Sequence, residues 1–342
     1  MNKLLSIPLF NNYEPDHKYG LGKFIFVKNN SKEYKLILYL DHLAYDDMSF
    51  GYLIREIEKS YYADSNQSIK PLCYSNYAAE LRQGLDKKDP DIIIDKLKLN
   101  DHYKASKRIC KKPSRSDLYL FRYSIVIKDN YLNELIEVAT YLTAIICSKI
   151  FQIENIPITL VSGNRKFHEH NYYNTVGLIE DLVPILIELG KNNYEHNRNN
   201  INNSLNYLSP NSINILSIYF TKYQDENWLP IIKLLNLEKL ITSEPVIILN
   251  IEFDSGKRGI YEDSSVNSAN NEISIVKSKD KSRIYNLKKK GGIIFWVDIT
   301  KNSISFKIES LFPIEEQHFN TFRQDINEFI ESAAETNNIP AA

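Results

Sequence analysis

The sequence lacks the marks of several large classes of protein. Its 3 cysteines among 342 residues are odd in number and far apart, which argues against a disulfide framework and favours reduced thiols. No apolar run reaches the length of about 18 residues that a membrane-spanning helix needs, and Pro8 interrupts the N-terminal segment, so we expect neither a membrane span nor a secretory signal. Lys plus Arg number 42 against 43 for Asp plus Glu, which argues against a general binder of nucleic acids or anionic membranes. We therefore expect a cytoplasmic protein.

Short motifs for metal binding or covalent catalysis are also missing. His168 and His170 are two residues apart, so their side chains would not share a helix face, and no third ligand follows at a suitable spacing. Cys147 lies in the apolar segment 131–151, which predicts a helix with this thiol in the core rather than a nucleophile. We expect no bound metal ion and no cysteine chemistry.

The sequence does contain enough apolar residues for a large core. With 43% hydrophobic and 12% aromatic residues, the chain is long enough for two domains. The basic stretch 104–115 contains Pro113 and predicts a solvated linker, so we place the domain boundary there, with domains at 1–112 and 113–342. Two polar segments, 192–206 and 257–281, predict loops.

One histidine stands out because of the elements predicted on either side of it. Residues 35–40 are short, apolar and rich in strand-forming types, which predicts a strand that ends just before His42. Apolar residues then recur at offsets of three and four: Phe50, Leu53, Ile54, Ile57 and Tyr61. This spacing predicts one apolar face of a helix that starts near Met48. His42 would therefore lie in a strand-to-helix turn, where a single histidine is by itself more typical of a polar turn than of a reaction centre.

The stretch around His42 resembles the signature of the condensation domains of nonribosomal peptide synthetases. That signature is two histidines, three variable residues and Asp-Gly, followed by an amphipathic helix, and here it reads Asp41-His42-Leu43-Ala44-Tyr45-Asp46-Asp47. Further segments resemble those of the family in the same order along the chain: 71–78, 162–165, 176–184, 244–253, a strand pair predicted at 291–306 and the helix predicted at 315–334. Each match is short, but their collinear order covers most of the chain.

The resemblance implies an α/β fold, a chloramphenicol-acetyltransferase-like architecture of two α+β two-layer sandwiches. The family transfers an acyl or peptidyl group from a carrier-bound thioester to an amine or a hydroxyl, with the residue that matches His42 as the catalytic residue. Asp46 matches the motif aspartate, whose family role is a structural salt bridge, and Arg165 is either its partner or a surface arginine of a turn. The chain itself would bind no cofactor, because 4'-phosphopantetheine is carried by the partner carrier proteins.

The chain departs from the family pattern at three places. Asp41 replaces the first motif histidine, and Asp47 replaces the motif glycine, which adds bulk and charge in the turn. Only forty residues precede the motif, so most of the first subdomain is expected to be missing. We therefore expect either a polypeptide partner that completes this subdomain or a loss of activity.

The chemistry of His42 is left open by the sequence. Neutral imidazole can accept the proton that an attacking amine loses near neutral pH. A helix N-terminus favours the neutral ring, whereas Asp46 and Asp47 stabilise the imidazolium form. His42 is therefore either a base or a positioning residue for the nucleophile or the oxyanion.

Two functions follow from the resemblance. The first is a condensation-type acyltransferase of nonribosomal peptide or secondary-metabolite biosynthesis, working with peptidyl or acyl carrier proteins or synthetase modules and with His42 at the reacting centre. The second is an inactive condensation-like domain that serves as a docking platform for the same partners. Retention of His42 and Asp46 favours the first function, whereas Asp47 and the short first half favour the second.

Overall fold

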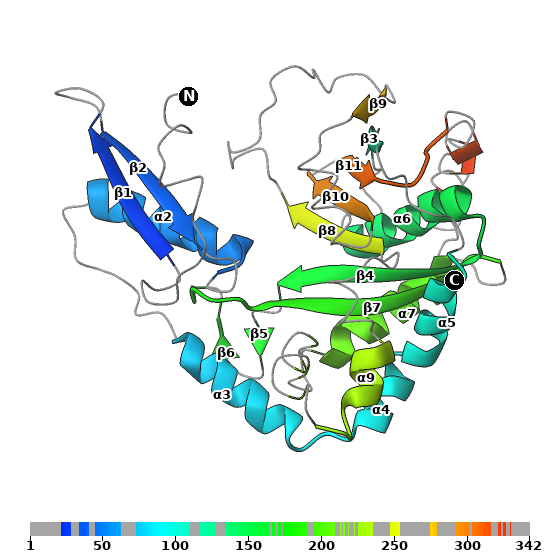
Figure 1. Ribbon diagram of the computed structural model, residues 1–342, viewed down its shortest axis with the longest axis horizontal. Helices are drawn as coiled ribbons and strands as arrows, with labels where there is room; N and C mark the ends of the chain where they lie inside the picture. The colour runs from blue at the N-terminus through cyan, green and yellow to red at the C-terminus, as the bar shows by residue number, and fades with distance from the viewer. Residues whose placement is uncertain are drawn as a thin grey trace, which may run out of the picture. The chain divides into compact units, whose positions relative to one another are not determined.

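The computed structural model describes two compact units that are interleaved along the chain (Figure 1). One unit consists of Met1–Glu80 with Gly163–Glu180, and the other of Leu81–Ser162 with Asp181–Ala342. We call them unit 1 and unit 2. The domain boundary predicted at residue 112 lies outside the described residues, and it stays a prediction. The structure describes residues 22–28, 34–40, 45–62, 73–109, 117–126, 134–163, 166–167, 170–172, 174–190, 194–208, 213, 215, 218, 222, 225–234, 247–253, 274–278, 292–300, 303–315, 321–322, 324–325 and 329.

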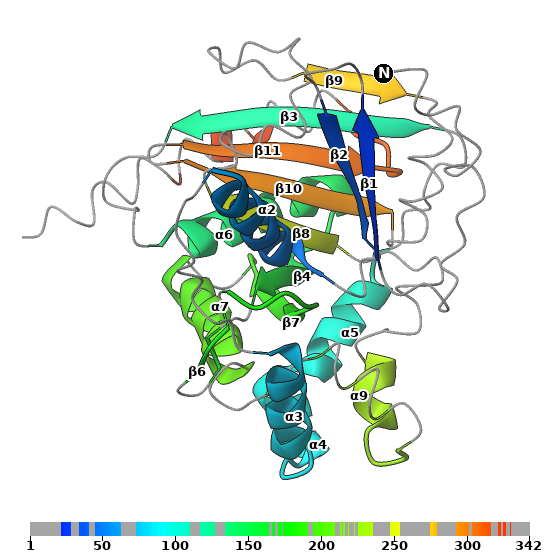
Figure 2. The ribbon, with the colours of Figure 1, turned by 90° about the vertical axis from the view of Figure 1, so that its left-hand side faces the viewer.

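Unit 2 is built on a mixed seven-stranded sheet with the strand order β7-β4-β8-β10-β11-β3-β9, which can be followed from bottom to top in Figure 2. The strands are β3 (Leu118–Val126), β4 (Asn155–Gly163), β7 (Glu180–Glu188), β8 (Ile247–Phe253), β9 (Ser274–Ser278), β10 (Ile293–Ile299) and β11 (Ser303–Ser310). β4, β8 and β10 are parallel neighbours. β10, β11, β3 and β9 form an antiparallel series.

Buried and half-buried side chains alternate along the strands, which places the main hydrophobic core on one face of this sheet. In β11 the apolar residues Ile304, Phe306 and Ile308 are buried, and the residues between them are only half-buried. The strand register places Phe306 beside Val297 of β10 and Tyr123 of β3, so the buried side chains of neighbouring strands meet on the same face. This pattern confirms the strand pair predicted at 291–306.

Helix α6 (Leu135–Phe151) covers that face and contacts β8 and β10. Its buried residues include Cys147, which is fully buried, and burial raises the pKa of this thiol well above its usual value. A protonated thiol in an apolar core is a poor nucleophile, as the sequence indicated. The α-helix predicted over 131–151 is confirmed within 135–151.

Residues 192–206 were predicted to be a loop, and this prediction is wrong. They belong largely to helix α7 (Tyr194–Leu208), which packs against α6 (Figure 1). The buried face combines two apolar residues, Ile201 and Leu208, with Asn197, whose side chain exchanges hydrogen bonds of 2.9 and 3.1 Å with the backbone of Glu188. A buried asparagine that pairs with a strand backbone replaces part of the apolar face that helix prediction relies on.

Two other loop predictions need partial correction. Residues 274–278, within the predicted loop 257–281, form β9 at the edge of the sheet. Residues 104–107, the first part of the predicted linker, end helix α5 (Leu99–Lys107). Helix α5 packs with α4 (Pro90–Lys96) and α9 (Leu229–Leu234).

Unit 1 contains a two-stranded antiparallel sheet of β1 (Gly22–Lys28) and β2 (Tyr34–Leu40) and helix α2 (Asp47–Tyr62). The strand predicted at 35–40 and the helix start predicted near Met48 are confirmed. Tyr61 was placed on the apolar face of the helix, but its side chain is 81% exposed. The unit also holds the first half of α3 (Tyr74–Leu85) and the short pair β5 (Lys166–Phe167) and β6 (His170–Asn171).

None of the helices within the described residues combines the length and the apolar character that crossing a bilayer requires. The same part of the chain shows no group of three or more histidine, cysteine or carboxylate side chains that could hold a metal ion.

A buried histidine that the sequence analysis did not single out ties α5 to β4. The Nε2 atom of His102 lies 3.3 Å from the carbonyl oxygen of Ile158, which only accepts, so this nitrogen carries the proton. Burial lowers the pKa of His102 to about 4, against the opposing effect of the hydrogen bond. The folded protein therefore holds this ring neutral at pH values where the unfolded chain protonates it.

This burial predicts a pH-dependent stability of unit 2. The unfolding free energy has its full value above about pH 6.5, where His102 is neutral in both the folded and the unfolded chain. As the pH falls toward 4, protonation of His102 in the unfolded chain lowers the unfolding free energy by up to about 3 kcal/mol. Urea unfolding of the wild type and of His102→Gln, which keeps an N–H donor without titrating, should show a shallower loss of unfolding free energy in the variant between pH 6.5 and 4.5. Equal slopes for the two proteins would contradict the assignment.

Candidate functional site

The residue that the sequence places at the reacting centre, His42, lies outside the described residues, as does Asp41. The structure does describe both ends of the segment that carries it. β2 ends at Leu40, and regular structure resumes with α2 at Asp47. The strand-to-helix arrangement predicted around His42 is therefore present, and the contacts of Asp46 define how it is held.

Asp46 anchors the start of α2. Its carbonyl oxygen accepts from the N–H of Phe50 at 3.0 Å, and its carboxylate Oδ1 accepts from the N–H of Ser49 at 2.7 Å. These are the contacts of an N-cap residue, which satisfies N–H groups that have no partner inside the helix. The N-cap contact is thus made by Asp46, one residue before Asp47, the first residue of the helix.

The same carboxylate reaches a segment far along the chain. Its Oδ2 accepts from the N–H of Ile179 at 3.0 Å, and its side chain is fully buried. A charged group without contact to water is stable only where hydrogen-bond donors surround it. Backbone and hydroxyl donors supply that environment, so Asp46 links α2 to residues 175–179, which overlap the segment 176–184 singled out in the sequence.

Ser49 forms the second half of this link. Its hydroxyl lies 2.7 Å from Asp46 Oδ1 and 2.8 Å from the carbonyl oxygen of Gly177, and it accepts from the N–H of Gly177 at 3.0 Å. Ser49 is fully buried. We refer to Asp46, Ser49 and residues 175–179 as the motif anchor.

Tyr74, the first residue of α3, covers the motif anchor. Its hydroxyl donates to the carbonyl oxygen of Leu178 at 3.2 Å, and its ring lies so close to Gly177 that a Cβ atom there would be 2.2 Å from Tyr74 Cδ2. Burial, and secondarily the charge of Asp46, raise the pKa of Tyr74. The close contact accounts for a glycine at position 177, because a side chain there would displace the ring.

Tyr172 fixes the segment that leads into the motif anchor. Its hydroxyl donates to Glu80 Oε1 at 2.8 Å, and its ring meets Tyr77 edge to face at 5.2 Å. The N–H of Thr175 donates to the carbonyl oxygen of Tyr172 at 3.0 Å. Burial, the hydrogen bond and the charge of Glu80 all raise the pKa of Tyr172, so its hydroxyl stays protonated and donates.

Gly163, which precedes the residues predicted to hold the partner of Asp46, lies close to the first turn of α2. A Cβ atom added to Gly163 would lie 3.1 Å from the sulfur of Met48, so the end of β4 contacts the first turn of α2. Arg165 lies outside the described residues, as does the side chain of Asp47. The pairing of Asp46 with Arg165 therefore stays a prediction.

The motif anchor holds its neighbours in place and is not itself suited to acid or base chemistry. Both carboxylate oxygens of Asp46 already accept hydrogen bonds, and no solvent reaches them. What the arrangement can do is fix Asp46 and the first turn of α2 against residues 175–179. Ser49 was not singled out from the sequence, because its contacts with Gly177 join residues that are far apart along the chain.

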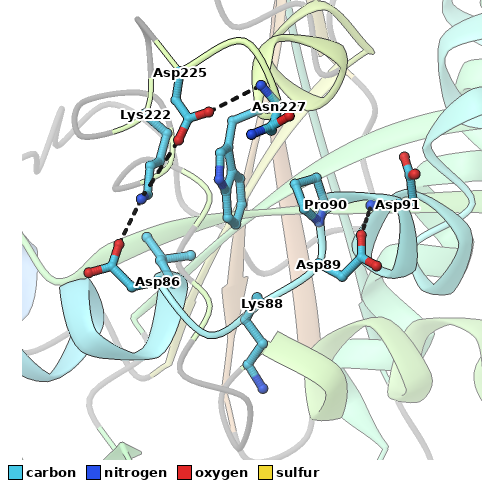
Figure 3. A pocket seen from close by; sticks show the side chains of 10 residues that line it. Asp86, Lys88, Asp89, Pro90, Asp91, Lys222, Asp225 and Asn227 are labelled. Atoms are coloured by element: carbon cyan, nitrogen blue, oxygen red, sulfur yellow. Dashed lines mark hydrogen bonds and ion pairs between the residues drawn. The ribbon is translucent and has the colours of Figure 1, made fainter.

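A separate polar pocket in unit 2 has a volume of about 430 Å³ (Figure 3). It lies between the α3–α4 connection and residues 222–228. The ammonium group of Lys222 is 2.7 Å from Asp86 and lies over the ring of Trp228, 5.7 Å from its centroid. These contacts join the two segments across the pocket and give the charges of Lys222 and Asp86 a structural role.

Because of the contacts in the motif anchor, we expect Asp46→Ala to lower the unfolding free energy strongly. The change leaves the N–H groups of Ser49 and Ile179 buried without this acceptor, at a cost of about 3 kcal/mol in unfolding free energy. Asp89→Ala is the matched control, because Asp89 caps α4 with one exposed contact at 2.9 Å and should cost about 1 kcal/mol or less. Urea unfolding measures both values, and equal losses would show that the buried network contributes nothing beyond an ordinary cap.

Comparison with known proteins gives likeness in structure only. No protein-family model matches the chain, and no curated protein matches it. Among solved structures, the epimerization domain from the third module of tyrocidine synthetase B, TycB3(E), superposes with a TM-score of 0.53 at 12% identity, over 91% of this chain and 72% of that chain. A structure that describes condensation domain-mediated chain release from the enacyloxin polyketide synthase gives 0.56 at 11% identity, over 94% and 62%. The complex of the X-domain and OxyB from teicoplanin biosynthesis gives 0.51 at 12% identity, over 92% and 70%.

These superpositions establish the architecture and its extent. They cover nearly all of this chain, which itself spans 62% to 72% of the three matched chains. The sequence resemblance around His42 and the mixed α/β structure agree with them. The chain has the fold of condensation domains, the chloramphenicol-acetyltransferase-like α/β fold that its sequence implies.

Proposed function

We propose that the chain is an acyltransferase of the condensation type, which joins the acyl group of a carrier-bound thioester to an amine or a hydroxyl. The observation that carries this proposal is the motif anchor, because its fully buried carboxylate fixes the chain four residues after His42. Catalytic groups need such fixation, since displacements of about 1 Å can cost a hundredfold in rate. The fold supports the proposal without selecting the reaction, because one superposed structure is an epimerization domain.

The proposed reaction needs one proton acceptor near the attacking atom. The N–H or O–H of the acceptor attacks the thioester carbonyl, and the neutral imidazole of His42 takes the proton as the C–N or C–O bond forms. The C–S bond then breaks, and the leaving thiol receives the proton. In the positioning variant of this role, His42 only hydrogen-bonds the nucleophile or the oxyanion.

Partners follow from the same proposal. Peptidyl or acyl carrier proteins, or synthetase modules, would deliver the thioester on their 4'-phosphopantetheine arm, and the chain itself would bind no cofactor.

The alternative is an inactive condensation-like domain that serves as a docking platform. One observation favours it: a superposed structure is a complex of an X-domain with another protein, OxyB. The replacement of the motif glycine by Asp47 also fits a domain without turnover. The two functions differ in whether any acyl product depends on His42.

The first test is the turnover of acyl-pantetheine thioesters with amine and alcohol acceptors, followed by mass spectrometry. We expect product from the wild-type chain and a loss of about 100- to 10,000-fold in turnover for His42→Ala, the usual contribution of a general base. His196→Gln is a matched control, because His196 lies on α7 with a side chain 44% exposed, and its turnover should equal that of the wild type.

Two results would contradict the acyltransferase proposal. Turnover that survives His42→Ala unchanged would remove His42 from the reacting centre. The absence of product from the wild-type chain, also in the presence of carrier proteins, would favour the docking platform.

Replacement of Asp47 tests whether this residue obstructs the reaction. Asp47→Gly restores the motif glycine at the first position of α2, where it removes a side chain and a negative charge. We expect turnover to rise several-fold in the same assay. Turnover that falls or stays unchanged would show that Asp47 is no obstruction.

A further inference from the structure

Two positive side chains face each other across neighbouring strands of unit 2. The register of β11 and β3 makes Lys307 and Arg122 direct partners, and β10 places Trp296 opposite Lys307 (Figure 2). All three are half-buried, whereas the residues on either side of each along its strand are buried in the main core. Because side chains alternate between the two faces of a strand, these three lie together on the face opposite the main core, which we call the second face.

Two hydroxyl groups lie beside the two cations. Ser305 and Ser124 are the next partners on the second face, and their Oγ atoms are 2.9 Å apart. Two cations and two hydroxyls thus form a two-by-two block on adjacent strands. We call it the donor block: Arg122, Ser124, Ser305 and Lys307. All four side chains can donate hydrogen bonds to an anionic group.

The carboxylates of the second face do not pair with Arg122. Glu309 lies 3.5 Å from the ammonium group of Lys307, and Asp298 lies two strands away from Arg122, opposite Ser305. Within the described part of the chain, Arg122 makes no ion pair and no side-chain hydrogen bond. A half-buried cation directly opposite a second cation is unfavourable unless an anion compensates the charge.

Apolar side chains of the second face border the donor block. Trp296 and Leu120 pack against a small buried cluster that includes Ile294. Leu120 is two residues before Arg122 on β3, so the charged and the apolar parts of the face adjoin. A ligand that matches both parts has an apolar body and an anionic group. The planar fork of a guanidinium matches a carboxylate in particular, because two parallel hydrogen bonds form between them.

We infer that the donor block binds the carboxylate of a small organic acid whose apolar part lies beside Trp296. Arg122 supplies the paired N–H groups, Lys307 a second charge, and the two serines hydroxyl donors. As an assignment of substrate class, the inference rests on the proposed acyltransferase function and deepens it, because it names an organic acid as the donor or the acceptor of that reaction.

A structural role for Arg122 makes a different prediction for stability. A residue kept for binding, and placed opposite another cation, should be dispensable for folding. We therefore expect Arg122→Gln to unfold in urea at a midpoint no lower than that of Arg108→Gln. Arg108 is the matched control, because it is an exposed arginine of unit 2. A midpoint clearly below that of the control would assign Arg122 a structural role and overturn the inference.

Binding is measured by NMR on the full chain and does not depend on turnover. The probe is benzoate, and benzamide is its uncharged counterpart of the same shape. The two tryptophans of the chain give two indole N–H signals, and the Trp296 signal is assigned by its loss in Trp296→Phe. The signal of Trp228 is an internal control, because this side chain is 4% exposed and belongs to the main core.

We expect benzoate to shift the Trp296 signal to saturation and benzamide to leave it in place. Arg122→Gln should raise the Kd for benzoate by at least about 10-fold, the usual effect of a lost charged hydrogen bond, and Arg108→Gln should keep the wild-type Kd. The inference is overturned if benzoate gives no saturable shift, if benzamide shifts the signal equally, or if Arg122→Gln keeps the wild-type Kd. Tighter binding of inorganic phosphate than of benzoate also overturns it, because the block would then be a phosphate site.

The thioester assay shows which substrate carries the acid. Arg122→Gln should raise KM by at least about 10-fold either for glycine but not glycinamide as the acceptor, or for succinyl-pantetheine but not butyryl-pantetheine as the donor. Wild-type KM values for all four compounds would contradict the assignment of substrate class. If the wild type gives no product, the acyltransferase proposal fails, and the benzoate titration alone decides whether the donor block binds an acid.

Discussion

The organisation of unit 1 depends on the hydrogen bonds that the buried carboxylate of Asp46 accepts. A charge removed from water requires several donors, and here the backbone and one hydroxyl provide them. Because those donors come from α2 and from residues 175–179, satisfying the charge brings two distant parts of the sequence together. The start of α2 and the position of residues 175–179 are therefore set by the same requirement.

Unit 2 is organised differently, around apolar burial on one face of a mixed sheet. Its buried polar groups are few among the described residues, and they pair with backbone. Asp181 accepts from the N–H of Ile215 at 2.6 Å, Asn197 pairs with Glu188, and His102 reaches Ile158. Each of these three side chains attaches another part of unit 2 to the backbone of β4 or to one end of β7.

Sequence reasoning succeeded where hydrophobic periodicity decides the structure. The strand before His42, the helix after it and α6 all follow from apolar spacing, whereas the β10–β11 pair and the fold follow from the resemblance of short motifs in order along the chain. It failed for α7, because Asn197 takes an interior position that periodicity assigns to apolar residues. It also missed β9, a polar edge strand that is defined by pairing with β3 rather than by its own composition.

The candidate site was only partly predictable for a related reason. Asp46 could be singled out because it belongs to a motif, whereas its pairing with Arg165 stays a prediction. Ser49 and Gly177 gain their importance from contacts across 128 residues, which no local pattern encodes. Long-range hydrogen bonds to backbone atoms leave little trace in a single sequence, because any residue supplies the same N–H and carbonyl groups.

The fold leaves the chemistry open, since superposed structures include an epimerization domain, a condensation domain and an X-domain. The central claim is that Asp46 and Ser49 form one buried network that joins α2 to residues 175–179, and a double-mutant cycle on unfolding free energy tests it most directly. If the two residues act as one network, the double variant Asp46→Ala with Ser49→Ala should lose less unfolding free energy than the sum of the two single losses. Losses that add would show that the two residues act independently and would contradict the account.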